Sequence, residues 1–125
     1  MMRPAATVFV VDDDEGVRDA LHQLLSSSGF ETRSFASAGE LLEVCAEDRA
    51  DCALVDVHMP GMSGFELMEQ MAARAIDLPV IVITGQGDAW MEQRALAAGA
   101  VGLLHKPVEQ NALLRMINLA LARNP

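Results

Sequence analysis

The feature of this sequence that most constrains its fold is the run Ala53–Gly61. Four apolar residues, Cys52 to Val55, lead to a single acid, Asp56, and the turn-forming residues Met-Pro-Gly follow shortly after it. This pattern predicts a buried strand whose carboxyl end opens into a loop. Because ligands bind at this edge of an open parallel sheet, we interpret Asp56 as a nucleophile. The alternative is that Asp56 caps a turn or the next helix.

Length and charge narrow the class of protein. With 125 residues the chain is expected to form a single domain, 1–125. The formal net charge of −9 disfavours nucleic-acid binding, which needs clustered basic residues. Cys45 and Cys52 lack the spacing of a zinc site or a disulfide framework, so both are expected to be reduced. The apolar run 8–11 is too short for a signal peptide or a membrane span, so a cytoplasmic protein is expected.

Hydrophobic periodicity predicts five strands that alternate with five helices. Four strands are apolar, and the second is short and polar, as is typical of an edge strand. Ser63 and Glu66 form the sequence pattern of a capping box before the third helix. Strands and helices that alternate in this way, joined by short loops, require βαβ crossovers and a parallel sheet, which predicts an α/β fold. The expected strands are 7–11, 31–35, 52–56, 78–84 and 101–104. The first expected helix runs from Asp14 to a stop at Gly29, the second covers 38–46, and the third begins after Ser63. The fourth runs from Asp88 to Ala98, and the fifth from about 109 to 123.

Residues suited to phosphate and metal chemistry follow four of the predicted strands. Asp12 and Asp13 follow the first strand, Asp56 ends the third, Thr84 ends the fourth, and Lys106 follows the fifth. Each alone has a plain structural explanation as a helix cap, a turn hydroxyl or a solvated cation. Because the carboxyl ends of parallel strands meet at one edge of the sheet, we expect the five side chains to converge there.

This set of residues suits phosphoryl transfer, which needs an in-line nucleophile, a hard cation and compensating positive charge. Mg²⁺ prefers oxygen ligands, which the neighbouring carboxylates would supply. A bound cation would also relieve repulsion within the acidic run 12–15. The Asp56 carboxylate can attack phosphorus to give an acyl phosphate. Lys106 would neutralise developing charge, and the Thr84 hydroxyl would donate a hydrogen bond to a phosphoryl oxygen.

Four motifs point to a known family. They are Val10–Asp14, Leu54–Gly64, Val82–Gly85 and Leu104–Pro107. With these motifs in this order, the chain resembles a bacterial response-regulator receiver domain over essentially its full length. The segments 84–88 and 98–102 are most similar to the FixJ and NarL group of receivers.

The resemblance implies a flavodoxin-like, doubly wound fold with a five-stranded parallel sheet in the order 2-1-3-4-5 and five helices. It implies that Asp56 accepts a phosphoryl group from the phosphohistidine of a sensor histidine kinase in a two-component system. Asp13, Asp56 and the backbone carbonyl of His58 would ligate Mg²⁺ directly, with Asp12 assisting, often through water. Lys106 would pair first with the carboxylate and then with the phosphate.

The resemblance also implies how the domain is used. It would be a signalling domain that catalyses only its own phosphorylation and dephosphorylation. Phosphorylation would switch the face formed by the fourth helix and fifth strand, and a phosphorylation-dependent homodimer could form there. No direct contact with nucleic acid or membrane is expected of residues 1–125, and a C-terminal output domain would lie outside them. The bond between Lys106 and Pro107 is expected to be cis, which is so for only about 5% of X-Pro bonds.

One position departs from the family pattern. Most receivers carry an aromatic residue three positions before the lysine, where this chain has Leu103. Leucine has no ring or hydroxyl to exchange between environments, so we hypothesise that signalling runs through the loop after Thr84 and the helix that contains Trp90. The alternative is that Trp90 simply packs. Gln86 would orient an attacking water and His58 would flank the phosphoryl group, unless both are solvated loop residues.

Two other interpretations remain open. Val11–Asp14 contains an Asp-x-Asp after a strand, as in haloacid-dehalogenase-like phosphatases, which would make Asp12 the nucleophile and Asp14 the general acid. The Thr or Val expected after Asp14, the acidic pair after the Thr84 strand and the cap domain are missing, however. The second is an interaction domain that keeps the receiver fold without being phosphorylated, although every chemical position is filled.

Overall fold

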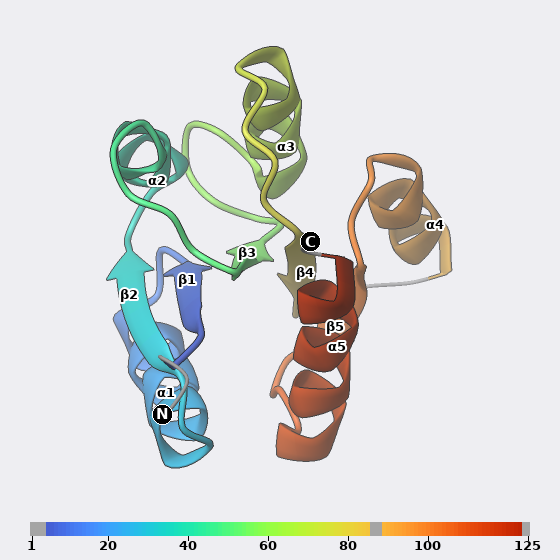
Figure 1. Cartoon of the computed structure of the whole chain (residues 1–125). Coiled ribbons are helices and arrows are strands. Elements are labelled where there is room, and N and C mark those ends of the chain that lie inside the picture. Colours follow the sequence, from blue (N-terminus) through green and yellow to red (C-terminus); the bar gives the residue numbers. More distant parts are fainter. Residues whose placement is uncertain (1–4, 86–88, 124–125) are drawn as a thin grey trace.

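The computed structural model describes residues 5–85 and 89–123. Five strands alternate with five helices along the chain, as the sequence predicts. The strands form one sheet with helices on both sides (Figure 1). The strands are β1 (Thr7–Val11), β2 (Glu31–Phe35), β3 (Cys52–Asp56), β4 (Val80–Thr84) and β5 (Gly102–His105), and the helices are α1 (Glu15–Ser27), α2 (Ala38–Cys45), α3 (Gly64–Ala73), α4 (Ala89–Ala97) and α5 (Gln110–Arg123).

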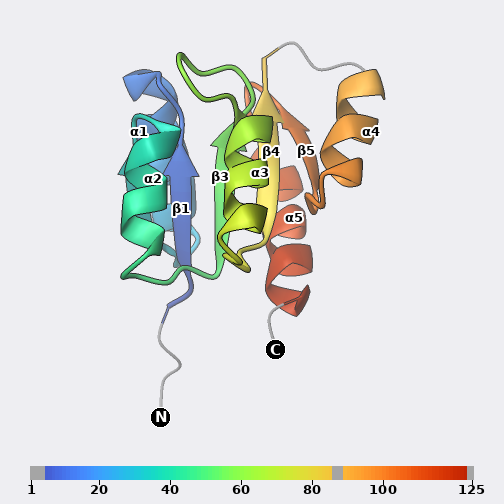
Figure 2. The same cartoon turned by 90° about the horizontal axis from the view of Figure 1, so that it is seen from above.

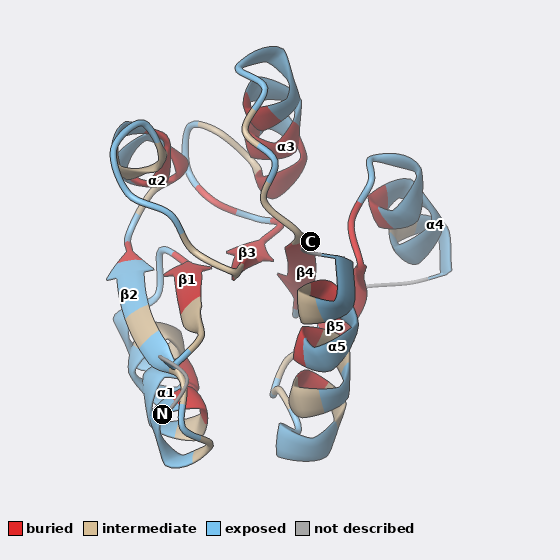
Figure 3. Cartoon of the chain, viewed as in Figure 1, coloured by how far each residue is buried: buried red, intermediate tan, exposed pale blue. Residues whose placement is uncertain are grey.

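All neighbouring strands pair in parallel, and their order across the sheet is β2-β1-β3-β4-β5. This confirms the doubly wound order that the resemblance implies. The polar strand β2 lies at an edge, as predicted, and β3 and β4 are buried along their whole length (Figure 3). Because every strand runs the same way, all five carboxyl ends lie at one edge of the sheet, the upper edge in Figure 2.

The sheet separates two hydrophobic cores. Val55 and Val82 belong to the core beneath α2, α3 and α4, whereas Leu54 and Ile81 belong to the core beneath α1 and α5. Figures 1 and 2 show the two groups of helices on opposite faces. Successive strand residues alternate between faces, and both faces are covered. The central strands are therefore apolar without interruption, as their sequences indicate.

Capping residues set the ends of several helices. The Ser63 hydroxyl accepts a hydrogen bond from the Glu66 N–H, and the Glu66 carboxylate accepts one from the Ser63 N–H, which confirms the predicted capping box. A second box, on Ser37, begins α2. Gly29 and Gly99 follow α1 and α4 with φ of +88° and +97°, a conformation that glycine adopts without strain. Among the described helices, none has the length and apolar character needed to cross a bilayer.

Some element boundaries differ from the prediction. Strand β4 begins two residues later than expected, at Val80, because Pro79 has no N–H to contribute to a ladder. Strand β5 begins and ends one residue later than expected, because Gly102 is its first residue to pair with β4. Asp88, the predicted cap of α4, lies outside the described residues. These shifts leave the order and direction of the elements unchanged.

Helix α3 approaches the end of β3 closely at Gly64. A Cβ atom on this residue would lie 2.5 Å from the backbone oxygen of Asp56. The Gly64 N–H also donates to the Val57 carbonyl at 3.0 Å. Because a backbone oxygen cannot swing aside as a flexible side chain can, glycine is required here to bring the helix against the strand end.

Gly64→Ala is therefore expected to lower the free energy of unfolding by about 1–3 kcal/mol, the usual cost of an overpacked site. Gly39→Ala, on the exposed side of α2, is the matched control, because the nearest atom to its Cβ would be 4.0 Å away. That change is expected to raise the free energy of unfolding by about 0.5–1 kcal/mol. Urea titration at constant m-value measures both, and equal effects of the two substitutions would contradict the close packing.

Candidate functional site

The register of β1 and β3 places their terminal acids side by side. Val11 pairs with Val55, so the next residues, Asp12 and Asp56, are neighbours at the edge of the sheet. Asp12 is fully buried and Asp56 is 3% exposed, whereas Asp13 is exposed. One carboxylate oxygen from each of these three aspartates lies within 4.8 Å of the other two. The three acids predicted to form a cation site therefore come together.

Strands β4 and β5 bring a hydroxyl and an ammonium group to the same edge. Thr84, the last residue of β4, is fully buried, and its carbonyl accepts a hydrogen bond from the Lys106 N–H at 2.8 Å. Lys106 Nζ lies 2.9 Å from Asp12 Oδ2 and 3.4 Å from Asp56 Oδ1. The peptide bond to Pro107 is cis, as the resemblance implies. All five residues expected at the strand ends are therefore at one edge.

The surroundings of Asp56 raise the pKa of its carboxyl group. Burial raises the pKa of the Asp56 carboxyl, and the negative charge of Asp12 raises it further. Lys106 and the His58 backbone N–H act in the opposite direction but only partly offset the first two effects. Ionising Asp56 therefore costs more free energy in the folded protein than it does for an aspartate in water.

Lys106 is the positive charge that makes this arrangement possible. Burial by itself lowers the pKa of Lys106, but hydrogen bonding and charge attraction from Asp12 and Asp56 outweigh it, so the pKa lies above its ordinary value. Lys106 is therefore charged at neutral pH, and its side chain is only 23% exposed. A half-buried ammonium that is charged at neutral pH and lies between two carboxylates can also neutralise a third anionic group placed beside them.

The charges at this edge do not balance without a further cation. The three carboxylates and one ammonium carry a formal net charge of −2. Among the described residues, Asp12 Oδ2 has no hydrogen-bond partner of good geometry, although Lys106 Nζ lies close to it. Ligands of one Mg²⁺ ion lie at most about 4.2 Å apart. The three carboxylate oxygens, which lie within 4.8 Å of one another, are near enough together to share one ion. The donor set therefore fits a hard divalent cation.

Helix α1 also contributes to the position of Asp12. Arg18 Nη1 donates to the Asp12 backbone oxygen at 2.6 Å, and the Asp14 N–H donates to Asp12 Oδ1 at 2.9 Å. Arg18 was not among the predicted site residues. A signal for it was present in the sequence, because a cation in the first turn of a helix is unfavourable unless it has a specific partner.

Asp14, in the same acidic run, has another role. Asp14 Oδ1 accepts a hydrogen bond from the Val17 N–H at 3.2 Å, and this exposed side chain caps α1. Of the described acids, only Asp12, Asp13 and Asp56 form the cluster. The phosphatase alternative needs Asp14 as a general acid, and its use as a helix cap gives that role no support.

Of the predicted modulating residues, those that the structure describes lie in β5, on α4 and in the loop after β3. Leu103 is buried in the core beneath α2, α3 and α4. Trp90 is 61% exposed on α4, which argues against a simple packing role. His58 is exposed in the loop after β3, with its N–H directed to the Asp56 carboxylate. Gln86 lies outside the described residues.

Asp56→Asn is expected to raise the free energy of unfolding at pH 7 without divalent cations, because it removes a carboxylate whose pKa is raised in the folded protein. A raised pKa means that the native state binds the proton more tightly, so the cost of ionisation appears as the pH rises above about 4, the unfolded value. The gain in stability should therefore shrink as the pH falls through this range. Urea titrations at several pH values test this, with Asp19→Asn on the exposed face of α1 as the control. A variant less stable than the parent at pH 7 would contradict it.

Comparisons with known proteins agree with this geometry. The chain matches the response regulator receiver domain family over residues 8–118. It is 40% identical over 120 residues to the transcriptional regulatory protein TdiR of Thauera aromatica, covering 96% of this chain and 53% of TdiR. It is 38% identical over 114 residues to the transcriptional regulatory protein FixJ of Bradyrhizobium diazoefficiens, covering 91% of this chain and 56% of FixJ.

Comparison with solved structures also finds receiver domains. The crystal structure of FixJ-N superimposes with a TM-score of 0.89 at 36% identity, covering 99% of this chain and 98% of FixJ-N. Full-length FixJ from B. japonicum gives a TM-score of 0.88 at 36% identity, covering 97% of this chain and 60% of that one. The chain spans about half the length of the curated relatives it matches. Its fold, its clustered acids with the adjacent lysine, and these matches together show that the chain belongs to the response regulator receiver domain family.

Proposed function

We propose that this domain accepts a phosphoryl group on Asp56, in a Mg²⁺-dependent reaction with a sensor histidine kinase as the donor. The observation that carries the proposal is the meeting of Asp56 with two further aspartates and Lys106 at one edge of the sheet. The family's use of aspartyl phosphorylation supports the same reaction. The domain acts as a signalling component that promotes its own phosphorylation and dephosphorylation.

Asp56 is a better nucleophile than Asp12 for a geometric reason. Asp12 is held by two polar contacts, because its Oδ1 accepts a hydrogen bond from the Asp14 N–H and Lys106 Nζ lies 2.9 Å from its Oδ2. Asp56 is held less tightly by the lysine, at 3.4 Å, and retains a small exposed area. A raised pKa also marks its carboxylate as more basic than an ordinary aspartate, which favours attack on phosphorus.

In the transfer step, an Asp56 oxygen gives an electron pair to phosphorus and forms a P–O bond. The P–N bond of the phosphohistidine breaks, its electron pair returns to the imidazole of the kinase, and that nitrogen takes up a proton from water. Lys106 then stabilises the negative charge on the phosphoryl oxygens. The Thr84 hydroxyl, at the end of β4, donates a hydrogen bond to one of them.

Asp12, Asp13 and Asp56 would hold Mg²⁺, with the His58 backbone carbonyl as a further ligand. When bound, the cation supplies positive charge that draws the phosphoryl oxygens together with the carboxylate nucleophile. Asp13 is the exposed member of the trio and therefore the member most accessible to an entering hydrated ion. Asp12 is anchored by Arg18 through its backbone oxygen, so its carboxylate is kept at the site before any ion enters.

We further propose that phosphorylation alters the face formed by α4 and β5 and promotes a homodimer through it. Helix α4 is weakly attached to the body, with Ala95 as its buried residue, so it can respond at small cost. The partner kinase would meet the domain in the cytoplasm. The chain covers about half of its relatives, and the activity of the whole protein would depend on what this switched face contacts.

Incubation with acetyl phosphate and Mg²⁺ is expected to add the mass of one phosphoryl group to the protein, because acetate can leave as the imidazole does. Asp56→Asn should abolish the gain, and Lys106→Ala should slow it at least about tenfold by removing charge stabilisation. Intact-mass spectrometry over time measures all three. Persistent phosphorylation in Asp56→Asn with loss in Asp12→Asn would favour the phosphatase-like alternative instead.

Mg²⁺ is expected to stabilise the folded protein, because it binds the native acids and relieves their repulsion. At 100 times Kd the free energy of unfolding should rise by about 2.7 kcal/mol. Asp13→Asn should lose most of this increase, whereas Asp19→Asn should keep it. Thermal and urea unfolding with and without EDTA provide the measurement, and an equal response of both variants would count against the assigned ligands.

A further inference from the structure

Among the described helices, α4 has the fewest buried residues. Of its nine residues, all of them described, only Ala95 is buried, and Trp90 and Leu96 are 61% and 49% exposed. Figure 3 shows α4 as largely exposed. A helix with so little buried surface can change position at low cost in free energy.

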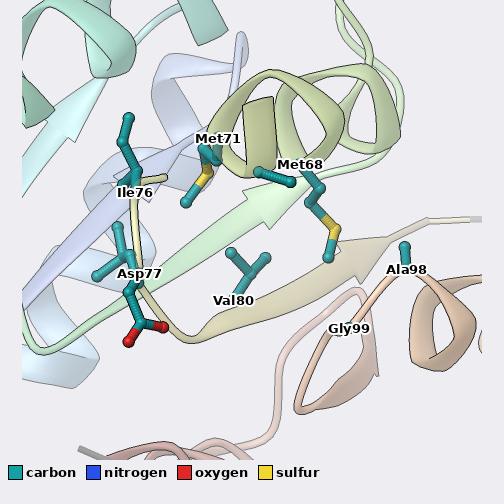
Figure 4. A pocket seen from close by; sticks show the side chains of 9 residues that line it. Met68, Met71, Ile76, Asp77, Val80, Ala98 and Gly99 are labelled. Atoms are coloured by element: carbon teal, nitrogen blue, oxygen red, sulfur yellow. The ribbon is translucent and has the colours of Figure 1, made fainter. Parts of the chain in front are cut away.

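A cavity borders the end of this helix. Its volume is about 130 Å³, and its lining includes Met68 and Met71 of α3, Val80 of β4, and Ala98 and Gly99 just after α4 (Figure 4). Methionine side chains are flexible and fill irregular spaces readily. The space between α3 and the turn that follows α4 can therefore be repacked when either helix moves.

Arg94, in the last turn of α4, links this helix to the first turn of α3. Its guanidinium carbon lies 4.2 Å from the centroid of the Phe65 ring and 5.7 Å from that of Trp90. Phe65 is 4% exposed, so its ring is held in place by the core and moves with the start of α3. A guanidinium over an aromatic face is an attractive contact with a preferred geometry. Arg94 thus joins a buried ring on α3 to an exposed ring on α4.

The same end of α3 contacts the backbone of Asp56. Gly64, which precedes Phe65, leaves so little room that a Cβ would lie 2.5 Å from the Asp56 carbonyl oxygen, and its N–H donates to Val57. Any adjustment of the backbone around Asp56 must therefore be transmitted to the first turn of α3. Two contacts, one at Gly64 and one at Phe65, connect the end of β3 with Arg94 of α4.

We propose that Phe65, Arg94 and Trp90 form a relay that reports the phosphorylation state of Asp56 to α4. The relay rests on the proposed phosphorylation of Asp56. A phosphoryl group on a side chain that is only 3% exposed forces its surroundings to adjust, and Gly64 is in direct contact with that backbone. The Phe65 ring shifts with the turn, Arg94 changes its stacking, and the exposed Trp90 side chain changes its environment. Leu103, buried in the same core, needs no large movement for this route.

The test uses Mg²⁺ with beryllofluoride as the phosphoryl mimic and reads the backbone amide resonances of residues 89–97. ¹⁹F resonances of bound beryllofluoride report occupancy of the site independently, and the emission of Trp90, the sole tryptophan, gives a second readout. In the wild-type protein we expect the α4 amides and Trp90 emission to change on binding. In Arg94→Ala and Phe65→Leu the α4 amide changes should fall at least about fivefold, the lower bound of typical coupling between sites, with beryllofluoride still bound.

Arg33→Ala is the matched control. Arg33 also stacks on two rings, with its guanidinium carbon 5.9 Å from the Phe9 centroid and 5.7 Å from the Phe35 centroid, but it lies on the edge strand β2. This variant should keep the full α4 response. Arg94→Ala could change Trp90 emission simply by removing the guanidinium next to the indole ring. Phe65→Leu keeps the contact between Arg94 and Trp90, so a loss of response in this variant reports loss of the relay and not a local change in quenching.

Each contrary result has a distinct meaning. An α4 response in Arg94→Ala equal to that of the wild type would overturn the relay. So would unchanged α4 amides in the wild-type protein with beryllofluoride bound, a result that leaves the proposed phosphorylation of Asp56 intact. Absence of bound beryllofluoride in the wild-type protein would overturn the proposed function, and the relay with it.

Discussion

The structure depends on the contact of one ammonium group with two buried carboxylates. Asp12 and Asp56 end adjacent strands and are almost completely removed from water, where two like charges repel strongly. Lys106 lies within 3.4 Å of both and supplies the compensating charge. The positive charge of Lys106 does not balance all the negative charge at this site, because the third carboxylate, from Asp13, leaves an excess. The site is thus folded but electrostatically unsatisfied, a state suited to taking up a cation.

A rigid scaffold maintains this arrangement. The acids stand at the ends of two central strands that are buried on both faces, so their backbone positions are set by the sheet. Arg18 of α1 holds the Asp12 carbonyl, and Gly64 of α3 lies against the Asp56 carbonyl. Helices from opposite faces of the sheet therefore support the same edge. Because strain at either carbonyl would move a carboxylate, packing in the cores and chemistry at the edge are directly coupled.

The same scaffold contains one weakly attached element. Helix α4 has a single buried residue, a neighbouring cavity and an exposed tryptophan, in contrast to strand β4, which is buried along its whole length. Signalling domains need this difference in stability, since a uniformly rigid protein would not convert a local change in charge into a change in surface. The contact of Arg94 with Phe65 connects the weakly attached helix to the rigid strand end.

Local patterns were sufficient to predict much of this protein. The order of the elements, the capping box at Ser63 and the five residues at the strand ends followed from the sequence, because periodicity, capping and turn chemistry act between residues close in the chain. The strand order 2-1-3-4-5 came from the family resemblance, since an alternating pattern of strands and helices is compatible with several orders.

Only the tertiary structure decided which atoms meet. It paired Lys106 more closely with Asp12 than with Asp56, assigned Asp14 to a helix cap, brought Arg18 to the Asp12 carbonyl and placed Arg94 over Phe65. These contacts depend on strand register and on the distance between a helix and the sheet. Both are set by the packing of side chains that lie far apart in the sequence, so no local pattern contains them.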